Sequence, residues 1–473
     1  MELRRLTENP ILILSTVICA ALLVPALFMD GMFMDGLIYS CVGKNLSLGI
    51  GTFWDPQFSA TYMMSYHEQP PLMFGMEAIF FKLLGTSMYT ERVYCLFMAI
   101  MCFLALRFTW KTLFEKNSPE QKLVWIPILF FFASPVTFWA YTNNVEEATM
   151  VVFALASAGC QWKGIRAQGN GFGWFALGGF ALIAASMCKG MQGLFPIIIP
   201  ITWFIFVRTI SLKKAILGNS IVFAIPAIWY LGLSFYEPAV NSYTSYFHDR
   251  ILATFNVAGA ATTSSRFFLL FELLLNVLPA LFVGTLLAIA ARKIIRTYRK
   301  EAVFFLLIGL AGIIPLMITL EQRGFYLLTA LPFIAIALAL CVIDGGQIVL
   351  NKVERSKNLK LALHFTSILF LSGTLVATFL LAGEPKRDAD LLHDVELIGR
   401  KCGKGSTVSA NESTRTNWSL QGYFIRYHNI SIARNDTTVN YYIIQKGDPS
   451  PIGYSPAKLE TRKYDLYLLT TDN

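Results

Sequence analysis

Acidic and basic side chains that could do chemistry stand at the edges of long apolar runs in this sequence. Two aspartates, Asp30 and Asp35, lie five residues apart in a repeated Met-Asp-Gly directly after the first apolar run. Three cations, Lys189, Arg250 and Arg323, lie in or beside the gaps between later apolar runs. If these groups converge, the cations could bind a phosphate while a carboxylate accepts a proton from an incoming hydroxyl group.

The composition indicates the solvent in which these residues work. The chain has 473 residues, of which 55% are hydrophobic and 15% charged. Soluble domains carry about 25% charged residues, so the sequence predicts an integral membrane protein. The net charge of +9 does not predict a nucleic-acid partner, because the basic residues form short clusters between apolar runs. No cysteine pair has metal-ligand spacing, and no disulfide framework is expected.

The apolar runs predict the elements that position the candidate residues. A helix needs about 20 residues to cross the apolar core of a bilayer. Eleven runs are long enough for an expected span, at 10–29, 92–110, 123–141, 147–162, 172–187, 190–207, 215–236, 267–291, 302–320, 325–344 and 361–383. The segment 71–86 is also short and carries Glu77 and Lys82, and we expect it to lie in the outer interface, because counting it as a span would place the later basic clusters on the outer side.

The distribution of basic residues predicts the orientation. With 71–86 excluded as a span, most lysines and arginines before residue 384 fall on the side of the N-terminus, as the positive-inside rule requires of a cytoplasmic face. The basic residues left for the opposite side are Lys44, Lys82, Arg92, Lys189, Arg250, Arg266 and Arg323. Two long outer loops, 30–91 and 237–266, follow from this topology. Long loops tend to carry function, so we expect the chemistry on the outer face.

The tail, residues 384–473, has the composition of a water-soluble segment. "DADLLHDVELIGRKC" has helical periodicity, and "STVSA", "HNISIA", "VNYYIIQK" and "YDLYLLT" are typical of short strands. We expect a small α/β domain on the outer side of the membrane. It shows no glycine-rich phosphate loop, nucleophile elbow or metal motif, so the tail is expected to act as a lid or a docking surface.

Local context separates some candidates from ordinary loop residues. Glu68 precedes a Pro-Pro that starts the interfacial helix, whose dipole favours an anion there, either Glu68 itself or a ligand phosphate. Glu146 and Glu147 begin a span, where helix capping is the alternative explanation. Lys189 lies between two spans beside glycine, where a lysine can also reach to the membrane surface. Glu321, Gln322 and Arg323 share a very tight turn, which favours a ligand.

The order of these motifs resembles polytopic glycosyltransferases of the GT-C class, specifically the protein O-mannosyltransferase and lipid A aminoarabinose transferase group. The resemblance runs in order from residue 1 to about 345, and the motifs are individually weak but strong as a series. The motifs are "MDGLIYS" with Asp35 and Tyr39, "EQPPL" from Glu68 to Leu72, "ERVYCLF" with Arg92, "NNVE" from Asn143 to Glu146, "CKGMQG" with Lys189, Gly190 and Gly193, and "RGFYLLTALP" with Arg323, Tyr326 and Pro332.

The resemblance implies a GT-C transmembrane catalytic domain, which the apolar runs place over 1–383, with its site on the periplasmic side of the inner membrane. The tail 384–473 matches no family motif, and the topology alone makes it a periplasmic domain. It implies an inverting transfer of a hexosyl or pentosyl group from a polyprenyl-phosphate sugar to a hydroxyl or phosphate of a lipid, glycan or protein acceptor. Asp35 is then the expected base, Glu68 orients the acceptor or Gln69, and Asp30 is a boundary or supporting acid. Residues 237–266 are expected to form a mobile gate over the site. The expected donor-phosphate ligands are Lys189, Arg250, Arg323 and Tyr326, and the expected supporting residues are Tyr39, Gln69 and Glu146.

Two departures from the family pattern limit what the resemblance implies. Aminoarabinose transferases carry arginine where this chain has Ile38 and lysine where it has Gln69. Lipid A is therefore not assumed as the acceptor, and Lys44, together with the three phosphate-binding cations, is expected to compensate for the missing charges. Some relatives bind a divalent metal, and Glu68, Glu146 and His248 are the possible ligands here. No other cofactor is predicted.

Two other functions remain open from the sequence. A glycan ligase or polymerase with a lipid-diphosphate donor would use the same carboxylates and cations. A lipid or polysaccharide transporter would need charges or broken helices near the middle of the membrane, and an internal repeat. The candidate residues lie at span ends instead, and no repeat is visible, so the sequence favours the transferase.

Overall fold

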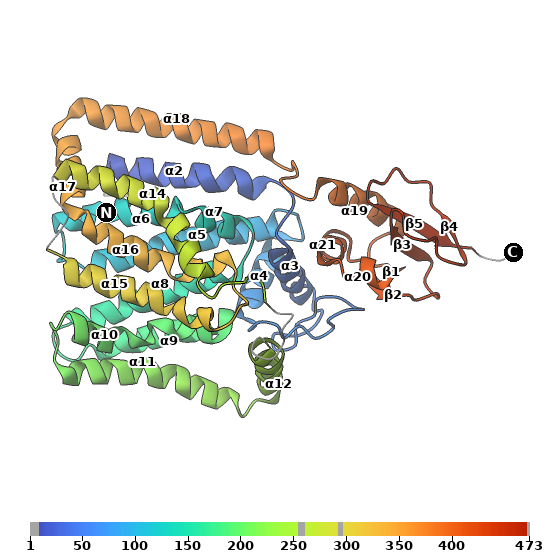
Figure 1. Ribbon diagram of the computed structural model, residues 1–473, viewed down its shortest axis with the longest axis horizontal. Helices are drawn as coiled ribbons and strands as arrows, with labels where there is room; N and C mark the ends of the chain where they lie inside the picture. The colour runs from blue at the N-terminus through green and yellow to red at the C-terminus, as the bar shows by residue number, and fades with distance from the viewer. Residues whose placement is uncertain (1–8, 254–260, 292–296, 471–473) are drawn as a thin grey trace.

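The chain forms a bundle of long helices with a small sheet-containing domain at one end (Figure 1). The computed structural model describes residues 9–253, 261–291 and 297–470. In Figure 1 most helices of the bundle run along the long axis of the molecule. Below, the site end of the bundle means the end next to the C-terminal domain, and the basic end means the opposite end.

Six helices in the part of the chain that the structure describes are long and apolar enough to cross a membrane. Two bent helix pairs raise this number to as many as eight, with bends of 75° and 72°. The six are α2 (Pro10–Phe28), α5 (Thr90–Thr112), the run Phe172–Phe206, α11 (Leu212–Leu233), α14 (Phe268–Ala291) and α18 (Lys357–Leu381). The bent pairs join η1 (Pro119–Val124) and α6 (Trp125–Phe132) to α7 (Pro135–Thr142), and α16 (Leu331–Cys341) to α17 (Ile343–Arg355).

These numbers are lower than the eleven spans expected, for three physical reasons. Helix α8 (Glu146–Arg166) has two acids in its first turn and two bases in its last turn, which lowers its hydropathy. Helix α15 (Arg299–Ala311) has only 13 residues. The run Phe172–Phe206 holds α9 (Phe172–Lys189), η2 (Gly190–Ile198) and α10 (Ile199–Phe206). This run counts as one candidate although two spans were expected in it, and the chain folds back at Gly190, because a Cβ on Gly193 would lie 2.4 Å from the carbonyl carbon of Ala185.

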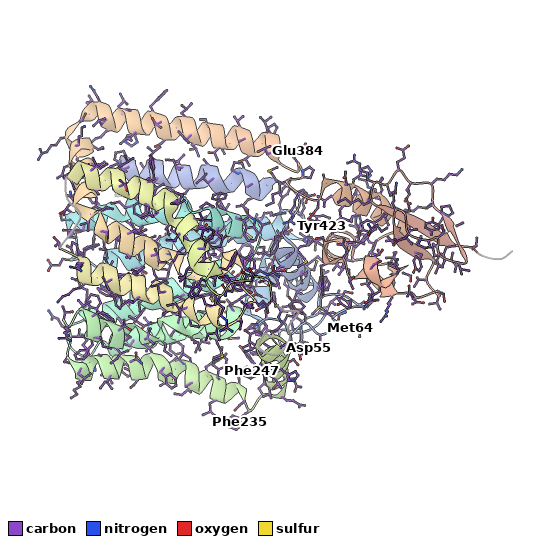
Figure 2. All side chains as sticks on the ribbon, viewed as in Figure 1. Asp55, Met64, Phe235, Phe247, Glu384 and Tyr423 are labelled. Carbon is purple, nitrogen blue, oxygen red and sulfur yellow. The ribbon has the colours of Figure 1, made fainter. Side chains whose placement is uncertain are left out.

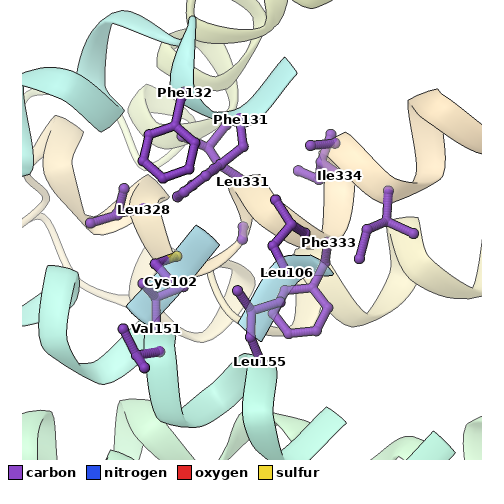
Figure 3. Close-up of a cluster of buried hydrophobic side chains, with 14 of the residues drawn as sticks. Cys102, Leu106, Phe131, Phe132, Val151, Leu155, Leu328, Leu331, Phe333 and Ile334 are labelled. Atoms are coloured by element: carbon purple, nitrogen blue, oxygen red, sulfur yellow. The ribbon is translucent and has the colours of Figure 1, made fainter. Parts of the chain in front are cut away.

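Buried apolar side chains hold the middle of the bundle together. Figure 3 shows Cys102 and Leu106 of α5 beside Val151 and Leu155 of α8, and Phe333 of α16 lies in the same group. All five of these residues are less than 1% exposed. Such dense packing fixes the helices relative to one another, and with them the short segments at their site ends.

Short helices cover the site end of the bundle. They are α3 (Met34–Ser47), α4 (Leu72–Leu84), α12 (Glu237–Tyr246), the π-helix η3 (Phe247–Leu252), and the 3₁₀ segments η5 (Ile314–Ile318) and η6 (Gly324–Thr329). Helix α4 corresponds to the expected interfacial helix and is not among the candidate spans. The expected gate 237–266 begins with two helices, and its residues 254–260 lie outside the described part of the chain.

The C-terminal domain contains a five-stranded sheet in the order β2-β1-β3-β5-β4. Strand β1 pairs in parallel with β2 and β3, whereas β5 pairs antiparallel with β3 and β4. The predicted helix and all four predicted strands are present, and the three-residue β4 was not predicted. The elements are α19 (Ala389–Cys402), β1 (Thr407–Ala410), α20 (Glu412–Arg415), α21 (Trp418–Tyr423), the π-helix η7 (Phe424–His428), β2 (Ser431–Arg434), β3 (Tyr441–Gln445), β4 (Tyr454–Pro456) and β5 (Tyr464–Leu469).

Buried charges attach this domain to the bundle. Arg426 of η7 lies 2.5 Å from Glu91 at the start of α5, with both side chains at most 2% exposed. Lys44 of α3 donates to the carbonyl oxygens of Ile425 and Arg426 and to Oδ1 of Asn429. Burial lowers the pKa of Lys44 to about 8. Figure 2 labels Tyr423 at the same junction, where its hydroxyl accepts from the backbone N–H of Met32.

Candidate functional site

A polar cavity of about 210 Å³ lies at the site end, between the bundle and the C-terminal domain. Eight of the nine residues predicted as catalytic, phosphate-binding or supporting line it, namely Asp35, Tyr39, Glu68, Gln69, Lys189, Arg250, Arg323 and Tyr326. A second cavity of about 510 Å³ shares Glu68, Lys189, Arg250 and Tyr326 with the first and adds mostly apolar walls. The structure therefore brings together side chains from five separate stretches of sequence next to an apolar space.

The two glycines of the repeated Met-Asp-Gly explain why its two aspartates have different positions. Gly36 packs so closely that a Cβ there would lie 1.8 Å from the carbonyl oxygen of Asn143. Asp35 thereby stands in the first turn of α3 and lines the cavity. Gly31 has φ of +78° and would place a Cβ 2.6 Å from the carbonyl oxygen of Arg387.

Asp30 is directed to the junction with the C-terminal domain instead of the cavity. Its Oδ1 accepts a hydrogen bond of 2.6 Å from the Tyr427 hydroxyl. A second bond of 2.6 Å reaches the same oxygen from the backbone N–H of Gly31. Asp30 is therefore a residue of the domain junction, and only Asp35 of the repeated motif lines the cavity.

The environment of Asp35 favours a carboxylate that can accept a proton. Burial raises the pKa of Asp35, and the positive charges of Lys189, Arg323 and Arg250 oppose this effect without cancelling it. A raised pKa makes the ionised carboxylate a stronger base than a solvated aspartate. The helix that carries Asp35 is fixed by Asn144, whose amide donates to the Ser40 hydroxyl at 2.9 Å.

Lys189 forms a buried ion cluster with two glutamates at the start of α8. Its Nζ lies 3.0 Å from Glu146 Oε2 and 3.2 Å from Glu147 Oε1. The lysine side chain is 10% exposed and both glutamates are fully buried. Its ammonium group has three donors and donates to Glu146 Oε2, whereas Glu147 Oε1 has no hydrogen-bond partner among the described residues, so at least one donor remains for a ligand in the cavity. Glu146 thus reaches the site through Lys189 and does not line the 210 Å³ cavity.

Arg250 lies between two carboxylates on opposite sides of the cavity. Its guanidinium is 3.5 Å from Glu68 Oε2 and 4.0 Å from Glu321 Oε1. The side chains of Arg250, Glu68 and Glu321 are 39%, 34% and 23% exposed, respectively, so water reaches this part of the cavity. Burial raises the pKa of Glu68, and the positive charge of Arg250 lowers it by less.

Arg323 is the most accessible cation of the cavity. Its side chain lines the cavity in an exposed position just before η6. Within 4.0 Å, no carboxylate of the residues that the structure describes forms an ion pair with it. A guanidinium in this position can bind a phosphate through two parallel hydrogen bonds.

Two predicted roles do not agree with the structure. Glu68, Glu146 and His248 do not form a metal site, because Glu68 pairs with Arg250, Glu146 with Lys189, and His248 with Asp249. Among the described residues, no three histidine, cysteine, aspartate or glutamate side chains are grouped to hold a metal ion. Lys44 cannot compensate for a missing phosphate ligand, because it is buried at the domain junction.

Trp418 of the C-terminal domain lines the cavity and was not predicted. The centroid of its ring lies 5.1 Å from the ring centroid of Tyr62 and 6.2 Å from that of Phe58, and both residues belong to the first outer loop. Tyr66 and Phe325 complete the aromatic part of the lining. No local motif marks Trp418, because its position depends on how the tail docks. Tyr66, in contrast, lies two residues from Glu68 and could have been included.

The bundle and the short helices at its site end have the fold of solved membrane glycosyltransferases of the GT-C class. The structure of ArnT from Cupriavidus metallidurans bound to undecaprenyl phosphate superposes with a TM-score of 0.68 at 12% sequence identity, over 98% of each chain. The Archaeoglobus fulgidus oligosaccharyltransferase in the apo form gives a TM-score of 0.54 at 13% identity, over 92% of this chain and 69% of that one.

A third structure extends the likeness to a larger transferase. Arabinofuranosyltransferase AftD from Mycobacteria gives a TM-score of 0.53 at 12% identity, over 97% of this chain and 40% of that one. No family model matches the sequence, and no curated protein matches it significantly. The GT-C fold predicted from the motif order is confirmed by these structural similarities.

Proposed function

We propose that this protein transfers a sugar from a polyprenyl-phosphate donor to a hydroxyl or phosphate of a lipid, glycan or protein acceptor. The observation that carries the proposal is the convergence of Asp35 with Lys189, Arg250 and Arg323 in one cavity that adjoins a larger, more apolar one. The likeness to an ArnT structure bound to undecaprenyl phosphate supports a polyprenyl carrier.

In this mechanism the acceptor oxygen attacks the anomeric carbon of the donor sugar. Asp35 removes the proton of an acceptor hydroxyl as the new carbon–oxygen bond forms. The bond from the anomeric carbon to the phosphate oxygen breaks, and polyprenyl phosphate leaves with the electron pair. Attack on the face opposite the leaving group inverts the anomeric centre. Arg323, Arg250 and the remaining donor of Lys189 stabilise the charge on the phosphate.

We further propose that the site faces the periplasm from a cytoplasmic membrane. The basic residues between the apolar runs support this orientation, because most of them lie at the basic end. Residues 1–383 would form the catalytic domain and 384–473 the periplasmic domain. The segment 237–266 would act as the gate, since its Arg250 pairs with Glu68 of the first outer loop across the cavity.

Replacing Arg323 by glutamine tests the proposed donor site. We expect this variant to bind undecaprenyl phosphate at least tenfold more weakly, because a charge-assisted contact to phosphate contributes about 1.5–3 kcal/mol. Native mass spectrometry with added lipid measures the affinity. The matched control is Arg266→Gln, an exposed arginine at the same end that does not line the cavity. Equal binding by both variants would contradict the donor site, and stronger binding of a polyprenyl diphosphate would favour the ligase function.

The pH dependence of turnover tests the role of Asp35. Only the ionised carboxylate can accept a proton, so kcat should fall as the pH drops through the raised pKa of Asp35. The acid limb should therefore lie above the ordinary aspartate value of about 3.9. Because the pKa of Glu68 is also raised, the same profile is measured for Glu68→Gln. An acid limb that disappears in Glu68→Gln would transfer the role of base to Glu68.

A further inference from the structure

A basic cavity of about 920 Å³ lies at the basic end of the bundle, far from Asp35. Helix α8 has 21 residues, so about 30 Å separates its two ends, one at Glu146 and the other at Arg166. The cavity is lined by five cations, Arg107, Lys111, Lys116, Lys163 and Arg166, and by Glu115 as its acid. The described part of this surface therefore carries a large excess of positive charge.

The cations of this cavity repel one another, and a bound anion would reduce this electrostatic repulsion. Arg107 and Lys111 are four residues apart on α5, while Lys163 and Arg166 are three apart on α8. Like charges at these spacings repel one another on a helix. The Nε of Arg107 is buried and has no hydrogen-bond partner among the residues described. An unsatisfied buried donor is unfavourable, and a phosphate oxygen would satisfy it.

Aromatic side chains give the same cavity an apolar side. The Nζ of Lys163 lies 4.2 Å from the ring centroid of Trp174 and 5.0 Å from that of Phe108. Trp174 is 36% exposed and Leu104, which also lines the cavity, is 43% exposed. Tryptophan is enriched where membrane helices meet the headgroup layer. A ligand held here would thus have its charge on the cations and its apolar part along the outside of the bundle.

We propose that this cavity binds the phosphate headgroup of an anionic phospholipid. The positive charge of the cavity and the unsatisfied Nε of Arg107 favour a phosphate as the ligand. The exposed Leu104 and Trp174 favour a phosphate that carries acyl chains over a free phosphate ion. Basic pockets between membrane helices recognise lipid headgroups in this way. This lipid site is separate from the proposed donor site, and it does not depend on the sugar-transfer function.

Native mass spectrometry of the full-length protein in detergent tests the lipid site. The protein is titrated with phosphatidylglycerol and with phosphatidylcholine of the same acyl chains. We expect one phosphatidylglycerol to bind in preference. The double variant Arg107→Gln/Lys163→Gln should bind it about 30-fold more weakly, because it lacks two charges near the headgroup. The matched control Lys352→Gln/Lys357→Gln removes two exposed lysines at the same end, outside the cavity, and should bind as the unaltered protein does.

A charge-conserving variant separates lipid binding from folding. Arg107→Lys/Lys163→Arg keeps both charges and should retain most of the preference for phosphatidylglycerol. Three results would overturn the proposal. They are equal binding of the two lipids, unchanged affinity in the glutamine variant, and displacement of phosphatidylglycerol by millimolar inorganic phosphate, which would indicate a site for a soluble anion.

Discussion

Replacing Asp35 by asparagine is expected to lower kcat by about 10²- to 10⁴-fold while leaving donor binding nearly unchanged. Asparagine keeps the shape of the side chain but cannot accept the acceptor's proton. Donor binding should persist, because the proposed phosphate contacts come from Lys189, Arg250 and Arg323. Turnover is measured with a polyprenyl-phosphate sugar, and binding with undecaprenyl phosphate by native mass spectrometry.

The duplicated motif supplies a matched control for this experiment. Asp30→Asn makes the same chemical change five residues away, at a carboxylate that bonds to Tyr427 and does not line the cavity. It should keep kcat within a few-fold and affect only the junction with the C-terminal domain. If Asp35→Asn lost donor binding but kept normal residual chemistry, or if Asp30→Asn abolished turnover, Asp35 would not be the base.

Replacing Lys189 by methionine is expected to have the largest effect on stability. Methionine leaves Glu146 and Glu147 fully buried without their cation. Removing one partner of a buried ion pair costs about 3–5 kcal/mol, because the remaining charge has no compensation. Thermal unfolding in detergent should therefore show a much lower midpoint, and the same variant should bind undecaprenyl phosphate more weakly.

A triple variant distinguishes the two roles of this lysine. Lys189→Met/Glu146→Gln/Glu147→Gln removes all three charges, so no buried carboxylate is left uncompensated, and most of the lost stability should return. Donor binding should not return, because the cation is still missing. If the triple variant bound donor as well as the unaltered protein, Lys189 would serve only the structure. If Lys189→Met unfolded at the same temperature as the unaltered protein, this result would contradict the buried ion cluster of Lys189 with Glu146 and Glu147.

The parts of the site that could be predicted are those with a local signal. Asp35, Glu68 and Arg323 stand in short motifs beside apolar runs, and the order of these motifs was sufficient to predict the fold. The helix and the four longest strands of the tail also followed from local periodicity. These features depend on neighbours within a few residues, which is the range over which sequence patterns report structure.

The parts that could not be predicted depend on tertiary docking. Lys44 looked like a phosphate ligand because it is a cation in the first outer loop, yet its partners are near residue 426. Trp418 has no motif at all and reaches the cavity because η7 and α21 pack against α3. The number of spans is a separate matter, since eleven were expected and six to eight helices meet the test of length and composition, and hydropathy alone cannot show that α15 is short or that two bent pairs break at 75° and 72°.

The position of Trp418 has a consequence for the order of events during synthesis. A ribosome makes the chain from residue 1 onward, so Asp35, Lys189 and Arg323 all emerge before the residue that completes the cavity wall. The wall also needs Arg426 to reach Glu91, near the start of the second long helix. A nascent chain therefore carries an unfinished site until Trp418 and Arg426 have been translated and the C-terminal domain has docked. Under the proposed function, sugar transfer would begin only after this domain has docked, and a chain truncated before residue 384 would not consume donor lipid.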